Sequence, residues 1–110
     1  MPLTHLLASL LAAQAPVPPD QAALAQCLGQ FVATRQQARE AVADFVNAFA
    51  SACHEEERAY RSAYVAAASA RSVPYLDADS EAYRNILDLR VRQRGAYLAS
   101  VIACDRPRRR

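Results

Sequence analysis

Large apolar side chains recur at steps of three and four along most of the chain, which is the spacing of one face of an α-helix. Asp20, directly after Pro19, is placed to begin the first helix of this stretch as an N-cap or first-turn acid. No glycine or proline interrupts residues 30–73. The pattern is carried by Leu24, Leu28, Phe31, Val42, Phe45, Phe49, Tyr60 and Tyr64.

One segment weakens this pattern, because large apolar residues are missing for about two turns over residues 34–40. A single helix of about fifty residues would extend about 75 Å and could bury its apolar face only along a partner or in an assembly. Alternatively, a short helix ends within residues 34–40 and a second one begins. The pattern leaves both possibilities open.

A firmer break is expected at Pro74, because proline cannot continue the preceding helix. Asp77 or Asp79 is placed to cap the next helix, which is predicted over residues 80–104 and ends before Pro107. Its apolar residues are Tyr83, Ile86, Leu87, Val91, Tyr97, Leu98, Val101 and Ile102. The predicted fold class is therefore all-α: a helical hairpin about Pro74, extended to a small three- or four-helix bundle by the N-terminal segments.

The amino-acid composition of the chain also favours α-helix. The chain has 25 alanines, two glycines and few β-branched residues, and 53% of its residues are hydrophobic. This apolar content disfavours a disordered chain, two glycines exclude a collagen-like one, and the scarcity of β-branched residues disfavours a β-sandwich. Alanine buries little area, so the larger side chains must supply most of the stabilisation.

The chain is expected to be a single domain, because 110 residues are too few for two independent cores. Four segments are expected along it: a signal-like apolar leader or first helix at 1–15, a proline-rich linker at 16–19, a helical domain at 20–105 and a basic tail at 106–110.

The leader has features of a signal peptide. Residues 6–13 form an uncharged apolar run, and residues 13–15, Ala-Gln-Ala, have the small-x-small form that signal peptidase reads. Against cleavage, residues 1–5 hold no Lys or Arg, and Pro16 would follow the cut bond. The run is too short to span a bilayer. These features favour an exported or periplasmic protein, with a cytoplasmic protein that retains this segment as its first helix as the alternative.

Charge offers a test of the hairpin. If the chain folds back about Tyr75, residues at equal distances from it face each other, so that Glu56 faces Arg94. An acidic run then lies opposite a basic one, and such exposed pairs are worth about 0–1 kcal/mol each. In the alternative, these charges face water and never meet. The candidate register residues are Glu55, Glu56 and Glu57 on one side and Arg90, Arg92 and Arg94 on the other.

Three cysteines, Cys27, Cys53 and Cys104, are spaced too widely for a Cys-x-x-Cys motif. On one straight helix Cys27 and Cys53 would lie about 39 Å apart, whereas a disulfide allows about 4.4–6.8 Å. This pairing therefore requires the chain to reverse within residues 34–40. Pairing Cys53 with Cys104 instead requires a register about one and a half turns away from the charge register. A third possibility is three buried, reduced thiols that pack as small apolar residues.

The leader, an early-helix cysteine and residues 52–57, Ala-Cys-His-Glu-Glu-Glu, together resemble small uncharacterised exported proteins of GC-rich bacteria, in which a Cys…Ala-Cys-x-x-Glu pattern recurs. The resemblance covers about residues 1–65. It implies a helical envelope or periplasmic protein with a disulfide between Cys27 and Cys53, and it implies no activity. Cys104 lies outside the pattern.

The residue types that enzymes need are sparse. A ferritin-like di-iron site takes Glu-x-x-His pairs, but Ser51 lies three residues before His54. Cys53 neighbours His54 in sequence, yet adjacent helical residues do not face each other. Gly29 and Gly95 are isolated, so no phosphate-binding loop is present. We therefore expect no catalytic residue, no metal site and no cofactor.

The formal net charge of +2 is too small to indicate a polyanionic partner for the whole domain. We expect a non-enzymatic helical interaction or structural protein, of the cell envelope, that binds a protein partner or its own copies. The alternative is a cytoplasmic nucleic-acid-associated or assembly subunit that places its arginine tail on phosphate. The candidate anion-binding residues of this tail are Arg106, Arg108, Arg109 and Arg110.

Overall fold

The structure, a computed structural model, describes residues 19–105, and these fold as four α-helices without a strand. The expected all-α class and small bundle are thereby confirmed. The leader, most of the linker and the basic tail lie outside the described residues. The helices are α2 (Pro19–Ala38), α3 (Val42–Ala50), α4 (His54–Ala70) and α5 (Tyr75–Asp105).

The stretch before Pro74 holds three helices, where one or two were expected. The break after Ala38 falls in the segment that lacks large apolar residues. A second break, at residues 51–53, was not predicted, since neither glycine nor proline marks it. There the chain turns at Cys53, whose backbone adopts the left-handed conformation with φ of 62°.

The last helix begins at Tyr75, five residues earlier than predicted. The N–H of Ala78 donates to the carbonyl of Pro74 at 3.0 Å, so the helical hydrogen bonds start at the proline itself. Asp77 therefore lies inside the first turn, where its charge favours the helix dipole, and neither it nor Asp79 is the cap.

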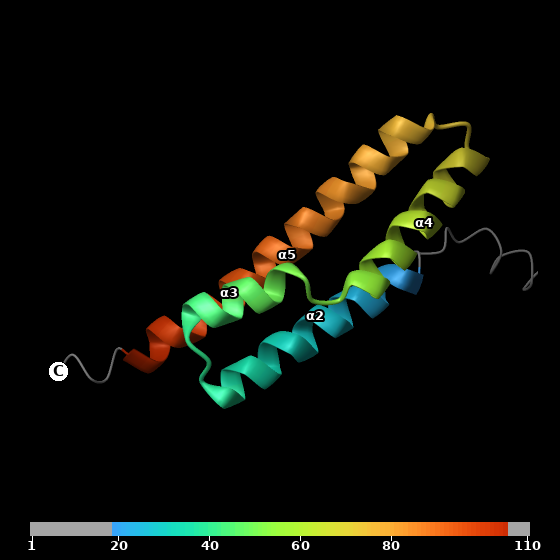
Figure 1. The fold of residues 1–110 in the computed structure, drawn as a ribbon. Coiled ribbons are helices and arrows are strands. Elements are labelled where there is room, and N and C mark those ends of the chain that lie inside the picture. The colour runs from blue at the N-terminus through green and yellow to red at the C-terminus, as the bar shows by residue number, and fades with distance from the viewer. Residues whose placement is uncertain (1–18, 106–110) are drawn as a thin grey trace, which may run out of the picture.

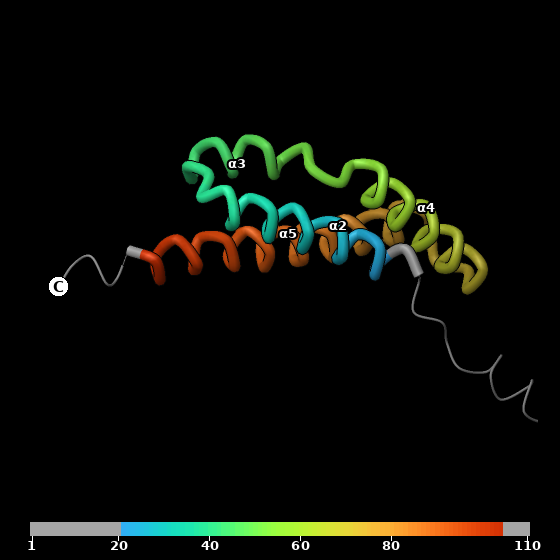
Figure 2. Tube along the Cα trace, turned by 90° about the horizontal axis from the view of Figure 1, so that it is seen from below, coloured from blue at the N-terminus to red at the C-terminus, as the bar shows by residue number. Residues whose placement is uncertain are grey.

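Helix α5 runs the length of the molecule, and its 31 residues span about 46 Å. Figure 1 shows α4 antiparallel to the first part of α5 and α2 alongside its later part. Helix α3 lies across α2 and α5, which completes a three-helix arrangement at that end (Figures 1 and 2). The other end is a two-helix hairpin of α4 and α5, so among residues 19–105 no helix covers one side of α5 there.

The core differs between these two ends. Aromatic rings fill the three-helix end, where Phe45 and Tyr97 stack with ring centroids 3.8 Å apart. The Tyr97 hydroxyl donates to the backbone carbonyl of Glu40, which satisfies its polar atom. In the hairpin, alanines are buried and let the helices approach closely. The main buried cluster consists of Leu24, Leu28, Val32, Phe45, Phe49, Tyr60, Ala82, Ile86, Leu89 and Tyr97.

Helix α2 ends in a Schellman motif without a glycine. The N–H of Arg39 donates to the Gln36 carbonyl at 3.1 Å, and the N–H of Glu40 donates to the Arg35 carbonyl at 3.2 Å. Arg39 adopts the left-handed conformation, with φ of 52°. The Arg35 guanidinium closes the turn, because its Nη1 bonds both carboxylate oxygens of Glu40 at 3.0 and 2.8 Å.

The same motif ends α4. The N–H of Ser72 donates to the Ser69 carbonyl, and the N–H of Val73 donates to the Ala68 carbonyl, both at 3.0 Å. Ser72 is exposed and has φ of 65°. A side chain in this conformation costs about 1–2 kcal/mol, a cost that glycine avoids.

We therefore expect Ser72→Gly to raise the free energy of unfolding by about 0.5–1 kcal/mol. The matched control is Ala66→Gly on the exposed side of α4, which should lower it by about 1 kcal/mol because glycine disfavours a helix interior. Urea titration followed by circular dichroism measures both. Equal destabilisation by the two glycines would contradict the left-handed turn at Ser72.

Candidate interaction surface

A partly buried arginine joins three helices at the break between α3 and α4. The Nε of Arg90, on α5, donates to the Glu57 carboxylate at 2.8 Å. Its Nη1 and Nη2 donate to the carbonyls of Phe49 and Ala52, at 3.0 and 2.7 Å. Phe49 lies in the last turn of α3 and Ala52 in the turn that follows, where the helix dipole favours a cation. Only 14% of the Arg90 side chain is exposed, so the group serves the fold and is not free for a ligand.

The candidate disulfide is present. Cys27 and Cys53 are bonded, with Cα atoms 6.0 Å apart, as the resemblance to exported proteins implies. The chain reverses after α2, so the bond ties the middle of α2 to the residue that precedes α4. Cys104 is a free, exposed thiol, and the competing pairing of Cys53 with Cys104 is therefore wrong.

The charge register brings together two of its candidate residues, Glu57 and Arg90, but not the pair that a centre at Tyr75 predicts. Glu57 pairs with Arg90, whereas the predicted pair of Glu56 and Arg94 does not form: one Glu56 carboxylate oxygen is buried without a hydrogen-bond partner. Arg92 pairs with Asp88 of its own helix at 3.0 Å. The pair of Glu57 and Arg90 is symmetric about a point between Val73 and Pro74, and not about Tyr75. Within the described residues, Glu55 and Arg94 are exposed and form no ion pair.

A second contact between α4 and α5 was not predicted. Arg61 donates two hydrogen bonds to the Asp79 carboxylate, from Nε at 2.6 Å and from Nη2 at 2.8 Å. These bonds lower the pKa of Asp79 and raise that of Arg61. In addition, the Arg61 guanidinium lies 5.6 Å from the centre of the Tyr83 ring. The contact therefore fixes the first turns of α5 on α4 and orients the ring of Tyr83.

The lowered pKa of Asp79 has a consequence for stability. A carboxyl with a depressed pKa in the folded state stabilises above its ordinary pKa of 3.8, and this stabilisation is lost as the pH falls through the lowered value. We therefore expect the difference in melting temperature between the wild type and Asp79→Asn to be constant from neutral to mildly acidic pH. Below the ordinary pKa the difference should shrink. Melting curves across this range measure it, and a difference that persists in strong acid would contradict the pairing.

The burial of Tyr64 is a smaller feature of the same hairpin. Desolvation raises the pKa of its hydroxyl, and a hydrogen bond with Glu81 raises it further. Its ring lies 5.9 Å from that of Tyr60, whose hydroxyl accepts a bond from the Asn85 amide at 3.0 Å. Both tyrosines therefore act in packing and internal hydrogen bonding.

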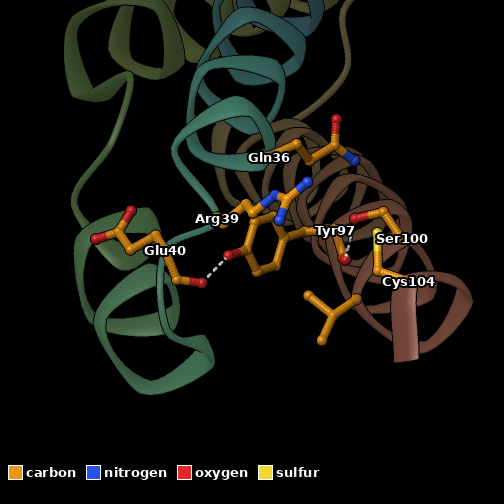
Figure 3. Close-up of a pocket in the computed structure, with 7 residues that line it drawn as sticks. Gln36, Arg39, Glu40, Tyr97, Ser100 and Cys104 are labelled. Carbon is orange, nitrogen blue, oxygen red and sulfur yellow. Dashed lines mark hydrogen bonds between the residues drawn. The ribbon is translucent and has the colours of Figure 1, made fainter. Parts of the chain in front are cut away.

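A cavity of about 400 Å³ lies between the end of α2 and the later turns of α5. Figure 3 shows the Tyr97 ring at its centre, with the hydroxyl bonded to the Glu40 carbonyl. The Ser100 hydroxyl donates to the Tyr97 carbonyl at 2.6 Å. Arg39 and the Cys104 thiol lie at its edge (Figure 3). The tyrosine and serine hydroxyls are thus engaged within the protein.

The largest departure from the predicted core is an exposed apolar face. Several residues of the last helix that were counted with its apolar face are 42–56% exposed, whereas Ile86 and Tyr97 of the same helix are buried. Two valines of α3 are also exposed, and one of them, Val46, lines a groove together with Leu87 and Val91 of α5. We call the set the α3–α5 stripe: Val42, Val46, Tyr83, Leu87 and Val91.

The two helices of the stripe border one groove of about 300 Å³. It is lined by Val46, Phe49, Ala50, Leu87, Arg90, Val91 and Arg94. A contiguous exposed apolar patch on a small protein marks an interaction site. A signal for it was present in the sequence, because the apolar residues of α5 are too many for one helical face.

A metal-binding cluster and a membrane-spanning helix are not found in the part of the chain that the structure describes. Across residues 19–105 no three His, Cys, Asp or Glu side chains gather to hold a metal ion, and none of the four helices has the length and apolarity to cross a bilayer. His54 is 67% exposed and lies 4.0 Å from Glu57. The candidate anion-binding arginines, 106 and 108–110, lie outside the described residues.

Comparison with known proteins gives no match: neither the models of protein families, nor the curated proteins, nor the solved structures contain one that is similar to this chain.

Proposed function

We propose that the chain is a non-enzymatic helical protein of an oxidising compartment, exported to the cell envelope, that binds a protein partner or its own copies. The contact surface in this proposal is the α3–α5 stripe. The observation that carries the proposal is the exposure of five large apolar side chains on α3 and α5, three of which, Val46, Leu87 and Val91, line one groove. Leaving such side chains in water is unfavourable, and a partner that covers them gains about 25 cal/mol per Å² of apolar area buried.

The disulfide supports the proposal of an oxidising compartment. Bonds such as that between Cys27 and Cys53 persist where the environment is oxidising, in secreted or periplasmic proteins, and are rare in the reducing cytosol. The signal-like run at residues 6–13 agrees with this location. Together they favour export over the cytoplasmic alternative with its arginine tail.

The polar network supports a binding role over catalysis. Arg90 and Glu57 bond each other and the end of α3, Arg61 bonds Asp79, and the Tyr97 hydroxyl bonds a backbone carbonyl. These polar groups hold the helices together, whereas the α3–α5 stripe exposes apolar side chains to solvent.

Mass spectrometry of the native chain tests the compartment. A mature protein that starts at Pro16 and whose mass is lower by two hydrogens, with one alkylatable thiol, supports export and oxidation. An intact Met1 with three alkylatable thiols would contradict both and favour the cytoplasmic alternative.

The binding role is tested by affinity purification of the tagged protein from its source cell. We expect a protein, or untagged copies of the chain, to be recovered with the wild type and lost with Leu87→Glu in the stripe. Equal recovery with both variants would show that the stripe is not the contact surface.

A further inference from the structure

We propose that the α3–α5 stripe binds a second copy of this chain, packed antiparallel so that the two α5 helices meet at Leu87. This inference rests on the proposed function and names the partner of the same surface. Three independent features of α5 carry it: the spacing of its exposed apolar residues, the groove beside it and the distribution of its charges.

The spacing of apolar residues is symmetric about Leu87. Tyr83 and Val91 lie four residues to either side of it. The exposed Leu76 lies eleven residues before it, and Leu98, which is half-buried against the core of its own chain, lies eleven residues after it. In an antiparallel pair with a two-fold axis at Leu87, each residue faces its counterpart across the centre. Leu87 then meets Leu87 of the second copy, Tyr83 meets Val91, and Leu76 meets Leu98. Apolar side chains therefore meet at each of these levels, as a self-complementary interface requires.

The groove accepts the largest side chain of the stripe. Tyr83 is 48% exposed, and its ring lies on the edge of α5 that borders α4, beside Arg61. A two-fold axis keeps this edge of both copies on the same side of the interface. The axis brings Tyr83 of one copy to the level of Val91 of the other, where the groove of about 300 Å³ lies between α3 and α5. Arg94 lines that groove and can cover the ring as a cation, which adds to the apolar contact.

The charges of α5 favour the antiparallel direction. Acidic residues precede Tyr83 and basic residues follow Leu89, so an antiparallel pair places opposite charges side by side, whereas a parallel pair places like charges together. Near the centre, Arg84 of one copy lies level with Arg90 of the other, whose guanidinium is bonded to Glu57 of its own chain, and two residues along from Asp88 of the other copy. The segregated residues that are not bonded to charged residues of α4 are Asp77 and Glu81 in the first turns, and Arg92 and Arg94 in the later ones.

The test is the oligomeric state of the full chain with Cys104 replaced by serine, so that no free thiol contributes. Sedimentation velocity at micromolar concentration should give twice the monomer mass. Leu87→Glu should weaken the dimer at least tenfold, because it places two carboxylates against each other at the axis. The matched control is Ile102→Glu, an equally apolar residue that is 63% exposed but lies beyond the end of the partner α5 helix. This control should leave the dimer intact.

A crosslink tests the geometry. In the same background, Leu87→Cys should form a disulfide-linked dimer with a mild thiol oxidant, and Ile102→Cys should not. A monomeric parent chain, or a dimer that survives Leu87→Glu, would overturn the self-association. A monomer that binds a different protein through Leu87 would also overturn it while the proposed function stands. Loss of both kinds of binding would overturn the proposed function as well.

Discussion

Replacing Cys27 with serine is expected to lower the free energy of unfolding by about 3–4 kcal/mol. The disulfide to Cys53 closes a loop with a sequence separation of 26, and in the chain-entropy model a loop of this length restricts the unfolded chain by that amount. A small domain is stable by about 5–15 kcal/mol in total, so the bond supplies a large share.

Because of where the disulfide lies, its removal should destabilise α3 more than the other helices. The closed loop contains α3, whose nine residues are too few for an independently stable helix. Phe45 and Phe49 hold α3 in the core, and the disulfide fixes the chain on both sides of it. Reduction should therefore loosen α3 before it separates α4 from α5.

Urea unfolding of the oxidised wild type and of Cys27→Ser measures the effect. Cys104→Ser is the matched control, because Cys104 is exposed and unbonded, and it should change stability by less than about 0.5 kcal/mol. Hydrogen exchange on the reduced protein should show the first loss of protection at residues 42–50. If Cys27→Ser is as stable as Cys104→Ser, the bond contributes nothing to the fold.

The helical periodicity of Leu24, Leu28 and Phe31 was sufficient to predict helix there, because spacing along one chain decides which residues share a face. The break at residues 51–53 could not be predicted in this way. Cys53 has no intrinsic preference for φ of 62°, and the disulfide and the bonds from Arg90 hold the turn from elsewhere in the fold. Local pattern contains no information on such distant contacts.

The candidate site could likewise be predicted only in part. The sequence correctly placed the acidic run of α4 opposite the basic run of α5, but it predicted that Glu56 faces Arg94, whereas Glu57 bonds Arg90. The observed pair is symmetric about a point about one and a half residues before Tyr75. Which apolar residues of α5 are exposed depends on where α2 and α3 end beside it. Ile86 and Leu87 are neighbours of similar chemistry in the sequence. Only the packing of the helices decides that Ile86 is buried and Leu87 is exposed.

Replacing Arg90 with alanine is expected to lower the free energy of unfolding by about 3 kcal/mol. The change leaves the Glu57 carboxylate and the carbonyls of Phe49 and Ala52 without their donor, in a place where the side chains of the ion pair are 14% and 22% exposed. Breaking a fully buried pair costs about 3–5 kcal/mol, and the partial exposure here places the effect at the lower end.

Two further variants separate charge from geometry. Arg90→Lys keeps the charge but cannot supply the planar set of donors that reaches three acceptors, so about half of the loss should remain. Arg92→Ala removes a neighbouring arginine whose ion pair with Asp88 is 66% and 69% exposed, and it should cost less than about 0.5 kcal/mol. Urea unfolding at neutral pH ranks the three variants by their free energy of unfolding. If Arg90→Ala is no less stable than Arg92→Ala, the junction of α3, α4 and α5 does not depend on this guanidinium, and the turn at residues 51–53 must be held by the disulfide alone.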